Sequence, residues 1–182
     1  MQEQANPPSK KLLVMMIIGL MTTLGGSALI MLYLGAFKDP EVFRATPQGY
    51  RIAYLSHKGA YSNIEPLFEQ VAAHLKQANI EPVTPCALFL DATSAVREPE
   101  RRSKVGYLVK RTDYIPAPLE EEIIPAREVV TATFDGGTLL GSHKAYSAMR
   151  EWARNHGYTL LLPALEIYHP SGTVEYQMPI HR

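Results

Sequence analysis

The chain has 182 residues, enough for one domain and an attachment. Its 18 Lys and Arg residues balance 18 Asp and Glu residues, so the net charge is zero and nothing predicts nucleic-acid binding. The single cysteine, Cys86, excludes an intramolecular disulfide framework and a cysteine-based zinc cluster. We therefore expect no nucleic-acid partner.

An uncharged apolar run covers residues 12–37 near the N-terminus. At roughly 1.5 Å per residue, a helix of this length crosses a hydrocarbon core of about 30 Å with some tilt. A cleaved signal peptide is the alternative, but its apolar region is shorter, roughly 7–15 residues, and Leu34-Gly35-Ala36 is a poor cleavage site. The run therefore favours an uncleaved single-pass transmembrane helix.

Two lysines, Lys10 and Lys11, precede the apolar run, whereas the basic residues after it are offset by acidic ones. This bias favours a cytoplasmic N-terminus, with the rest of the chain periplasmic or otherwise extracytoplasmic. The sequence then divides into a polar N-terminus, a transmembrane helix, a linker and a domain, at residues 1–11, 12–37, 38–48 and 49–182.

The domain contains an internal repeat whose two halves each read strand, helix, strand, strand. In the first half these segments are residues 51–61, 67–80, 85–91 and 105–110. In the second half they are residues 128–138, 145–158, 163–169 and 174–179. The predicted class is α+β: a pseudo-two-fold pair of βαββ units forming one antiparallel sheet, with two helices on one face and a groove on the other.

Glu166 lies in the middle of the apolar strand "PALEIYH". Because side chains alternate in a strand, Leu165 and Ile167 share one face, which we expect under the helix. Glu166 and Tyr168 then share the groove face, and a carboxylate without a partner there is costly. The alternative is a solvated glutamate, or one paired with a basic side chain.

Three stretches, "HKGAY", "IPAREVVTATFDGG" and "PALEIYH…VEYQMPI", resemble in order and spacing the GyrI-like domains related to AraC/BmrR effector modules. The resemblance implies a pair of βαββ units with a groove for hydrophobic, often cationic ligands. It places Glu166 at the acidic position of that groove, and Tyr168 and Tyr61 at aromatic positions. Tyr54 and Tyr107 are further candidate walls.

Two features depart from that family. The second turn, Gly136-Gly137-Thr138, lacks the usual aromatic residue, which places one wall of the groove in doubt. The usual regulators also carry a DNA-binding domain, and here an apolar N-terminal segment stands instead.

Other chemical motifs are weak. "GGTLLGSHK" (residues 136–144) resembles a phosphate-binding loop, but Ser142 stands where the motif needs lysine. The six histidines form no metal-binding pattern, no nucleophile elbow is present, and Cys86 is expected to be a packed strand residue. No cofactor and no metal are expected.

Three functional hypotheses follow. The first is a membrane-anchored module that binds a small hydrophobic or cationic ligand at Glu166. The second is a hydrolase-type enzyme of the GyrI-like family that uses Glu166 as an acid or base. The third is an interaction protein with a vestigial groove that docks a membrane protein partner.

Overall fold

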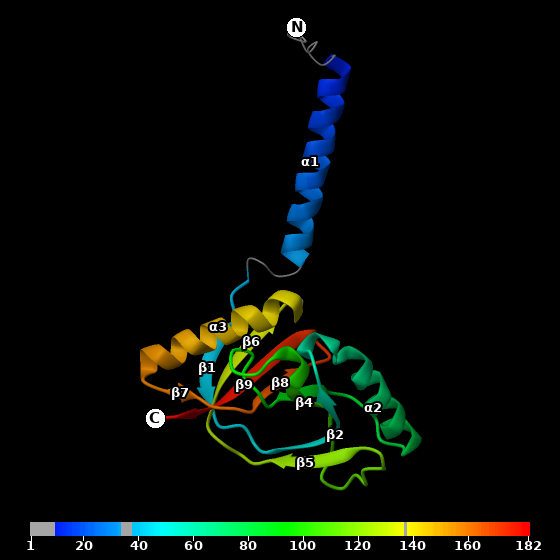
Figure 1. The fold of residues 1–182 in the computed structure, drawn as a ribbon, viewed down its shortest axis with the longest axis vertical. Coiled ribbons are helices and arrows are strands. Elements are labelled where there is room, and N and C mark those ends of the chain that lie inside the picture. Colours follow the sequence, from blue (N-terminus) through cyan, green and yellow to red (C-terminus); the bar gives the residue numbers. More distant parts are fainter. Residues whose placement is uncertain (1–9, 34–37, 137) are drawn as a thin grey trace.

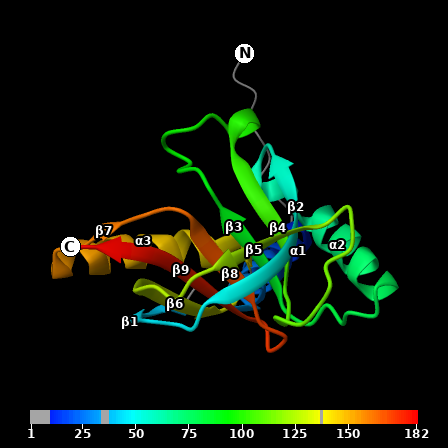
Figure 2. The same cartoon turned by 90° about the horizontal axis from the view of Figure 1, so that it is seen from below.

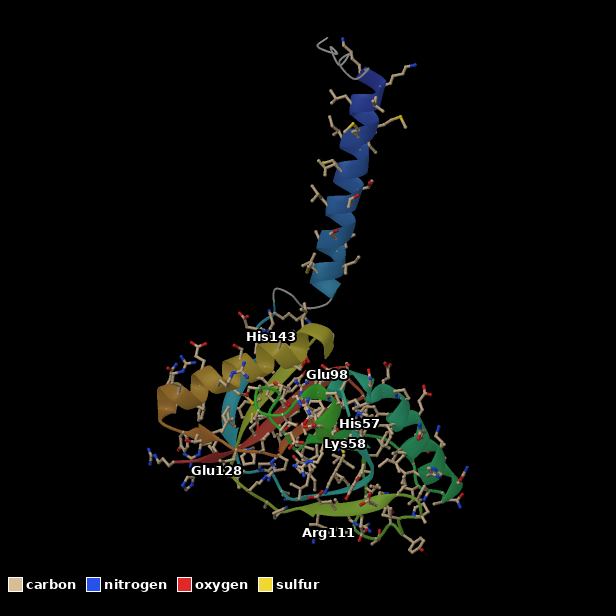
Figure 3. The ribbon with its side chains drawn as sticks, viewed as in Figure 1. His57, Lys58, Glu98, Arg111, Glu128 and His143 are labelled. Carbon is tan, nitrogen blue, oxygen red and sulfur yellow. The ribbon has the colours of Figure 1, made fainter. Side chains whose placement is uncertain are left out.

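The structure, a computed structural model, describes residues 10–33, 38–136 and 138–182. Helix α1 (Lys10–Tyr33) projects away from the domain, and its side chains point outward all round it (Figures 1 and 3). It is long and apolar enough to cross a membrane, as a membrane anchor or a signal sequence would be. The end of the predicted apolar run, residues 34–37, lies outside the described residues.

The two predicted βαββ units are both present. The first consists of β2 (Tyr50–Lys58), α2 (Glu65–Gln77), β3 (Pro85–Phe89) and β4 (Arg102–Leu108). The second consists of β6 (Val129–Asp135), α3 (Thr138–His156), β8 (Ala164–Tyr168) and β9 (Thr173–His181). Two short 3-10 turns, η1 (Tyr61–Asn63) and η2 (Glu98–Glu100), lie in the first unit. The strand and helix periodicities therefore predicted these elements correctly.

The units join into one antiparallel sheet of strand order β1-β6-β9-β8-β3-β4-β2-β5. Strands β3 and β8, the third elements of the two halves, pair with each other at the centre, where Ala87 lies opposite Glu166. The two halves are thus continuous through the strand that carries Glu166.

Three strands were not expected from the sequence. They are β1 (Glu41–Ala45), β5 (Glu120–Ile124) and β7 (Thr159–Leu160). β1 falls within the predicted linker, yet it pairs along its whole length with β6. The chain after α1 is therefore held in the sheet rather than forming only a loose tether.

The two helices α2 and α3 pack on one face of the sheet, α2 on the β2–β4 side and α3 on the β6–β9 side (Figure 1). Each inserts an apolar stripe: Val71 and Leu75 from α2, and Ala145 and Met149 from α3. This spacing of four residues is part of the amphipathic pattern that made the helices predictable.

The opposite face of the sheet is a closed core and not a groove. Leu165 and Ile167 pack there against Ile52 of β2 and Ile124 of β5. The paired strands β2 and β5 bend across this side of the sheet (Figure 2). The predicted groove opposite the helices is therefore wrong, because the unexpected strand β5 helps to cover that face.

Candidate functional site

Glu166 lies on the helix-facing side of β8, between α2 and α3. Its neighbours across the adjacent strands are Ala87 of β3 and Tyr176 of β9, and its side chain is 6% exposed. The predicted alternation is confirmed, because Leu165 and Ile167 share one face of β8 and Glu166 shares the other with Tyr168. The expected position of the helices is wrong: they cover the face of Glu166 and not the face of Leu165. Alternation alone carries no sign of which face the helices cover when both faces are buried.

Two tyrosine hydroxyls bind the Glu166 carboxylate. The Tyr146 O–H of α3 donates to Oε1 at 2.9 Å, and the Tyr168 O–H of the same strand donates to Oε2 at 2.8 Å. Hydrogen bonds to an ionised acceptor are stronger than neutral ones, so each oxygen has one strong donor. The bond from Tyr146 also connects α3 to the central strand.

The surroundings of Glu166 are unfavourable to its charge. Burial raises the pKa of this carboxyl above its ordinary value of 4.5, and the bonds from Tyr168 and Tyr146 offset only part of the effect. Burial, with the nearby carboxylate, raises the pKa values of both phenols well above normal, so their protons stay on oxygen. Within the described part of the chain, no ion pair involves Glu166.

Aromatic rings from both helices enclose the carboxylate. Phe68 of α2 contacts the Tyr168 ring edge-on, with centroids 5.5 Å apart. Tyr146 of α3 contacts Tyr176 in the same manner at 5.6 Å. Such rings present electron-rich faces that attract cations. The site combines a buried anion with an aromatic wall.

Of the other predicted site residues, Tyr107 lies on the helix-facing side, where its ring contacts Phe68 with centroids 6.3 Å apart. Tyr54 lies on the opposite face, in the core with Leu165 and Ile167, and its hydroxyl donates to Glu120 at 3.3 Å. Tyr107 therefore lies on the same face of the sheet as Glu166, and Tyr54 lies on the opposite face.

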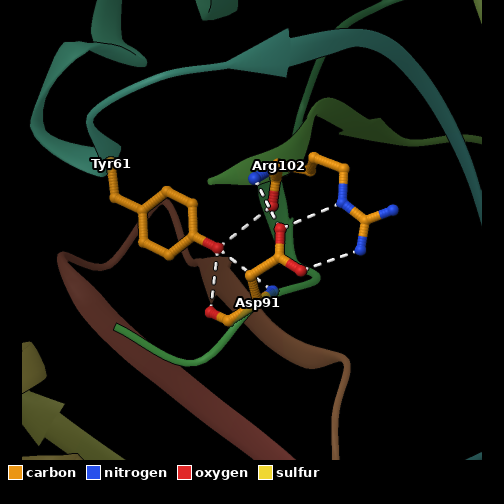
Figure 4. Close-up of polar contacts among 3 residues, drawn as sticks. All are labelled: Tyr61, Asp91 and Arg102. Atoms are coloured by element: carbon orange, nitrogen blue, oxygen red, sulfur yellow. Dashed lines mark hydrogen bonds and ion pairs between the residues drawn. The ribbon is translucent and has the colours of Figure 1, made fainter. Parts of the chain in front are cut away.

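Tyr61 has a different environment (Figure 4). Its ring packs beside Phe89 and in the same apolar cluster as Tyr168. Its hydroxyl donates to the carbonyls of Asp91 and Arg102 and accepts the Asp91 N–H, while the Arg102 guanidinium holds the Asp91 carboxylate. The hydroxyl therefore serves the β3–β4 connection, and only the ring faces the site cluster.

Three residues of the site, Tyr146, Tyr176 and Phe68, were not predicted from the sequence. All three carried a usable signal, since Phe68 and Tyr146 lie on the apolar stripes of their helices and Tyr176 shares a strand face with Val174. Apolar stripes predict core packing, however, and nothing in the sequence shows that a phenol on one helix reaches a carboxylate on a strand.

The turn that lacks the family aromatic, Gly136-Gly137-Thr138, lies partly outside the described residues, which exclude Gly137 and the side chain of Thr138. Among the residues that are described, no group of three or more His, Cys, Asp or Glu side chains could hold a metal ion. A cavity of about 250 Å³ lies beside Arg51 and Tyr114, away from Glu166.

The chain therefore has an α+β fold in which two βαββ units form one sheet and an acidic side chain is buried on the face that the helices cover. Residues 46–181 match the family described as the GyrI-like small molecule binding domain. This match spans most of the chain, and the chain belongs to the GyrI-like family. No curated protein sequence matches it.

Solved structures share the fold at low sequence identity. The EcmrR C-terminal domain has a TM-score of 0.61 at 15% identity, over 79% of this chain and 98% of that one. A hydrolase from Listeria innocua has a TM-score of 0.56 at 10% identity, over 80% and 95%. SAV2435 bound to tetraphenylphosphonium has a TM-score of 0.53 at 10% identity, over 78% and 94%.

Proposed function

We propose that this protein is a membrane-anchored binding module for small hydrophobic cations, with Glu166 as the counter-ion. The carrying observation is the buried Glu166 carboxylate, which has two phenol donors and no ion pair within the described residues. A protein that binds tetraphenylphosphonium has the same fold, which supports this chemistry.

The energetics favour a cation that is itself poorly hydrated. A buried carboxylate costs several kcal/mol unless it is paired, and a hydrophobic cation supplies the missing charge while losing little hydration of its own. The rings of Phe68, Tyr146 and Tyr168 add contact area and attraction to positive charge. A strongly hydrated ion such as ammonium gains less from this site.

Ligand entry requires rearrangement, because Glu166 is only 6% exposed and Tyr146 and Tyr168 hold its carboxylate in the core. The Tyr146 bond spans from α3 to β8, so an incoming cation competes with the contact that holds this part of α3 on the sheet. We expect binding to shift α3 relative to β8.

The test uses the full chain in lipid nanodiscs and equilibrium dialysis. Tetraphenylphosphonium is compared with tetraphenylborate, which has nearly the same shape and the opposite charge, and empty nanodiscs correct for partitioning. We expect saturable binding of the cation only, weakened at least about 30-fold in Glu166→Gln. The control Glu151→Gln changes an exposed carboxylate on α3 and should bind as wild type does. Equal affinity in Glu166→Gln would refute the proposal.

Acid–base catalysis is the second candidate function. A carboxyl with a raised pKa beside two phenols has the groups needed to move a proton, and a hydrolase from Listeria innocua shares the fold. The test is product formation from activated esters and strained-ring electrophiles. Turnover that disappears in Glu166→Gln supports an enzyme, whereas no turnover across both classes removes this candidate.

Anchoring is the remaining part of the proposal. We place α1 across the membrane with Lys10 and Lys11 on the cytoplasmic side and the domain outside the cytoplasm. Two measurements test this: resistance of the chain to alkaline extraction from membranes, and the activity of alkaline phosphatase fused after Arg182. Release of the chain by alkali would show that α1 is not a membrane anchor. An inactive alkaline phosphatase fusion would show that the domain lies in the cytoplasm.

A further inference from the structure

Tyr176 carries a buried hydroxyl with no protein partner. Its side chain is 0% exposed, and its oxygen has no hydrogen-bond partner among the described residues. Buried polar atoms in folded proteins are nearly always paired, so an isolated one calls for an explanation. The position of Tyr176 next to Glu166 in the sheet suggests one.

Tyr176 lies directly across from Glu166 on the adjacent strand, with its ring against Tyr146. Its hydroxyl, however, lies against the backbone of Gly141 in the first turn of α3. A Cβ atom on Gly141 would be only 2.9 Å from the Tyr176 oxygen. Of the three tyrosines closest to this carboxylate, two donate to it and the third is directed elsewhere.

The Tyr176 hydroxyl is a donor in this environment. Burial, together with the negative charge of Glu166, raises the pKa of its phenol, so the proton remains on the oxygen. The first turn of a helix also favours electron-rich atoms, because its backbone N–H groups carry partial positive charge. An acceptor atom placed at this point would be favoured by both groups.

We infer that the Tyr176 hydroxyl is a second anchor of the Glu166 site and donates a hydrogen bond to a neutral acceptor oxygen on the ligand. This inference rests on the proposed function and narrows the ligand to a hydrophobic cation that also carries a carbonyl or ether oxygen. A second negative charge is disfavoured because Glu166 lies on the neighbouring strand.

The experiment compares tetraphenylphosphonium, which has no acceptor, with the ortho, meta and para isomers of acetylphenyl-triphenylphosphonium. Dialysis with the full chain in nanodiscs gives the affinity of each. We expect the best isomer to bind wild type roughly threefold to tenfold tighter than tetraphenylphosphonium, the range for one net hydrogen bond. Tyr176→Phe should remove this preference, so that the acetyl isomers and tetraphenylphosphonium bind the variant with the same affinity. The exposed Tyr114→Phe is the control and should retain the preference.

A spectroscopic measurement separates a direct bond from an effect on packing. The carbonyl stretch of the bound acetyl isomer should move to lower frequency in wild type and stay at its unbound value in Tyr176→Phe. If all isomers bind like tetraphenylphosphonium, or if the preference survives in Tyr176→Phe, the inference is overturned while the cation site stands. If no cation binds wild type, the proposed function fails first and the inference falls with it.

Discussion

The Tyr146 hydroxyl on α3 and the Glu166 carboxylate on β8 are joined by a hydrogen bond of 2.9 Å. The bond connects a helix to a central strand of the sheet through a buried acidic group. It stabilises the charge of Glu166 and, at the same time, holds α3 against the strand whose carboxylate a cation must reach. Stability and ligand binding therefore oppose each other at this contact.

Removing the Tyr146 hydroxyl should separate these two effects. In Tyr146→Phe one oxygen of a buried carboxylate loses its donor, so we expect the free energy of unfolding at neutral pH to fall by about 1–3 kcal/mol. Binding of tetraphenylphosphonium should strengthen, because the cation no longer displaces a hydrogen bond. Urea denaturation and dialysis measure the two quantities. Weaker binding together with unchanged stability would contradict the role given to Tyr146.

The raised pKa of Glu166 predicts how stability depends on pH. Because the folded pKa lies above the ordinary value of 4.5, the folded state binds more protons than the unfolded state between these two pKa values. Stability attributable to Glu166 should therefore fall as the pH rises through this window, and the penalty is complete above the folded pKa. Glu166→Gln should lack this component.

The measurement is urea denaturation of wild type and Glu166→Gln from pH 4 to pH 8, about the range the linkage covers. The free energy of unfolding of Glu166→Gln relative to that of wild type should increase with pH and then level off. Cation affinity of wild type should rise over the same range, since only the ionised carboxylate attracts the ligand. A pH-independent difference between the two proteins would show that Glu166 titrates normally in the fold.

Tyr61 provides a test of which tyrosines serve the site. Its hydroxyl bonds the backbone of Asp91 and Arg102 and not Glu166 (Figure 4). Tyr61→Phe should therefore lower the free energy of unfolding by about 1–3 kcal/mol without changing tetraphenylphosphonium affinity. A loss of tetraphenylphosphonium affinity with unaltered stability would show that the Tyr61 hydroxyl contributes to the ligand site.

Two glycines should differ sharply when changed to alanine. A Cβ on Gly106 of β4 would lie 1.8 Å from the backbone oxygen of Ala53, which cannot move without breaking the β2–β4 pairing. A Cβ on Gly141 would meet two side-chain atoms, the Phe134 Cδ1 and the Tyr176 hydroxyl oxygen, each at 2.9 Å, and side chains adjust more readily than paired backbone.

We therefore expect Gly106→Ala to exceed the cost of about 1–3 kcal/mol that is usual for overpacking, and Gly141→Ala to remain within it. Thermal unfolding of the two variants in parallel gives the comparison. Similar stabilities would show that β2 and β4 adjust more readily than their backbone contact indicates.

Much of the fold was readable because it depends on local pattern. The stripe of Val71 and Leu75, like that of Ala145 and Met149, needs only the helical period to be recognised. β5 was not predicted because "EEEII" shows no alternation of apolar and polar residues. Its pairing with β2 also depends on chain segments far apart in sequence. β1 was not predicted because a short polar segment between two prolines is typical of a linker.

The sequence by itself determined the two βαββ units, the apolar N-terminal helix, and the singular position of Glu166 on an otherwise apolar strand. Local periodicity and residue type are sufficient for those conclusions. Only the tertiary structure decided that Glu166 faces the helices, that Tyr146 joins Tyr168 as its donor, and that Tyr176 is left without a partner. Those facts depend on how a curved sheet closes on one side and receives helices on the other, and no local pattern encodes that choice.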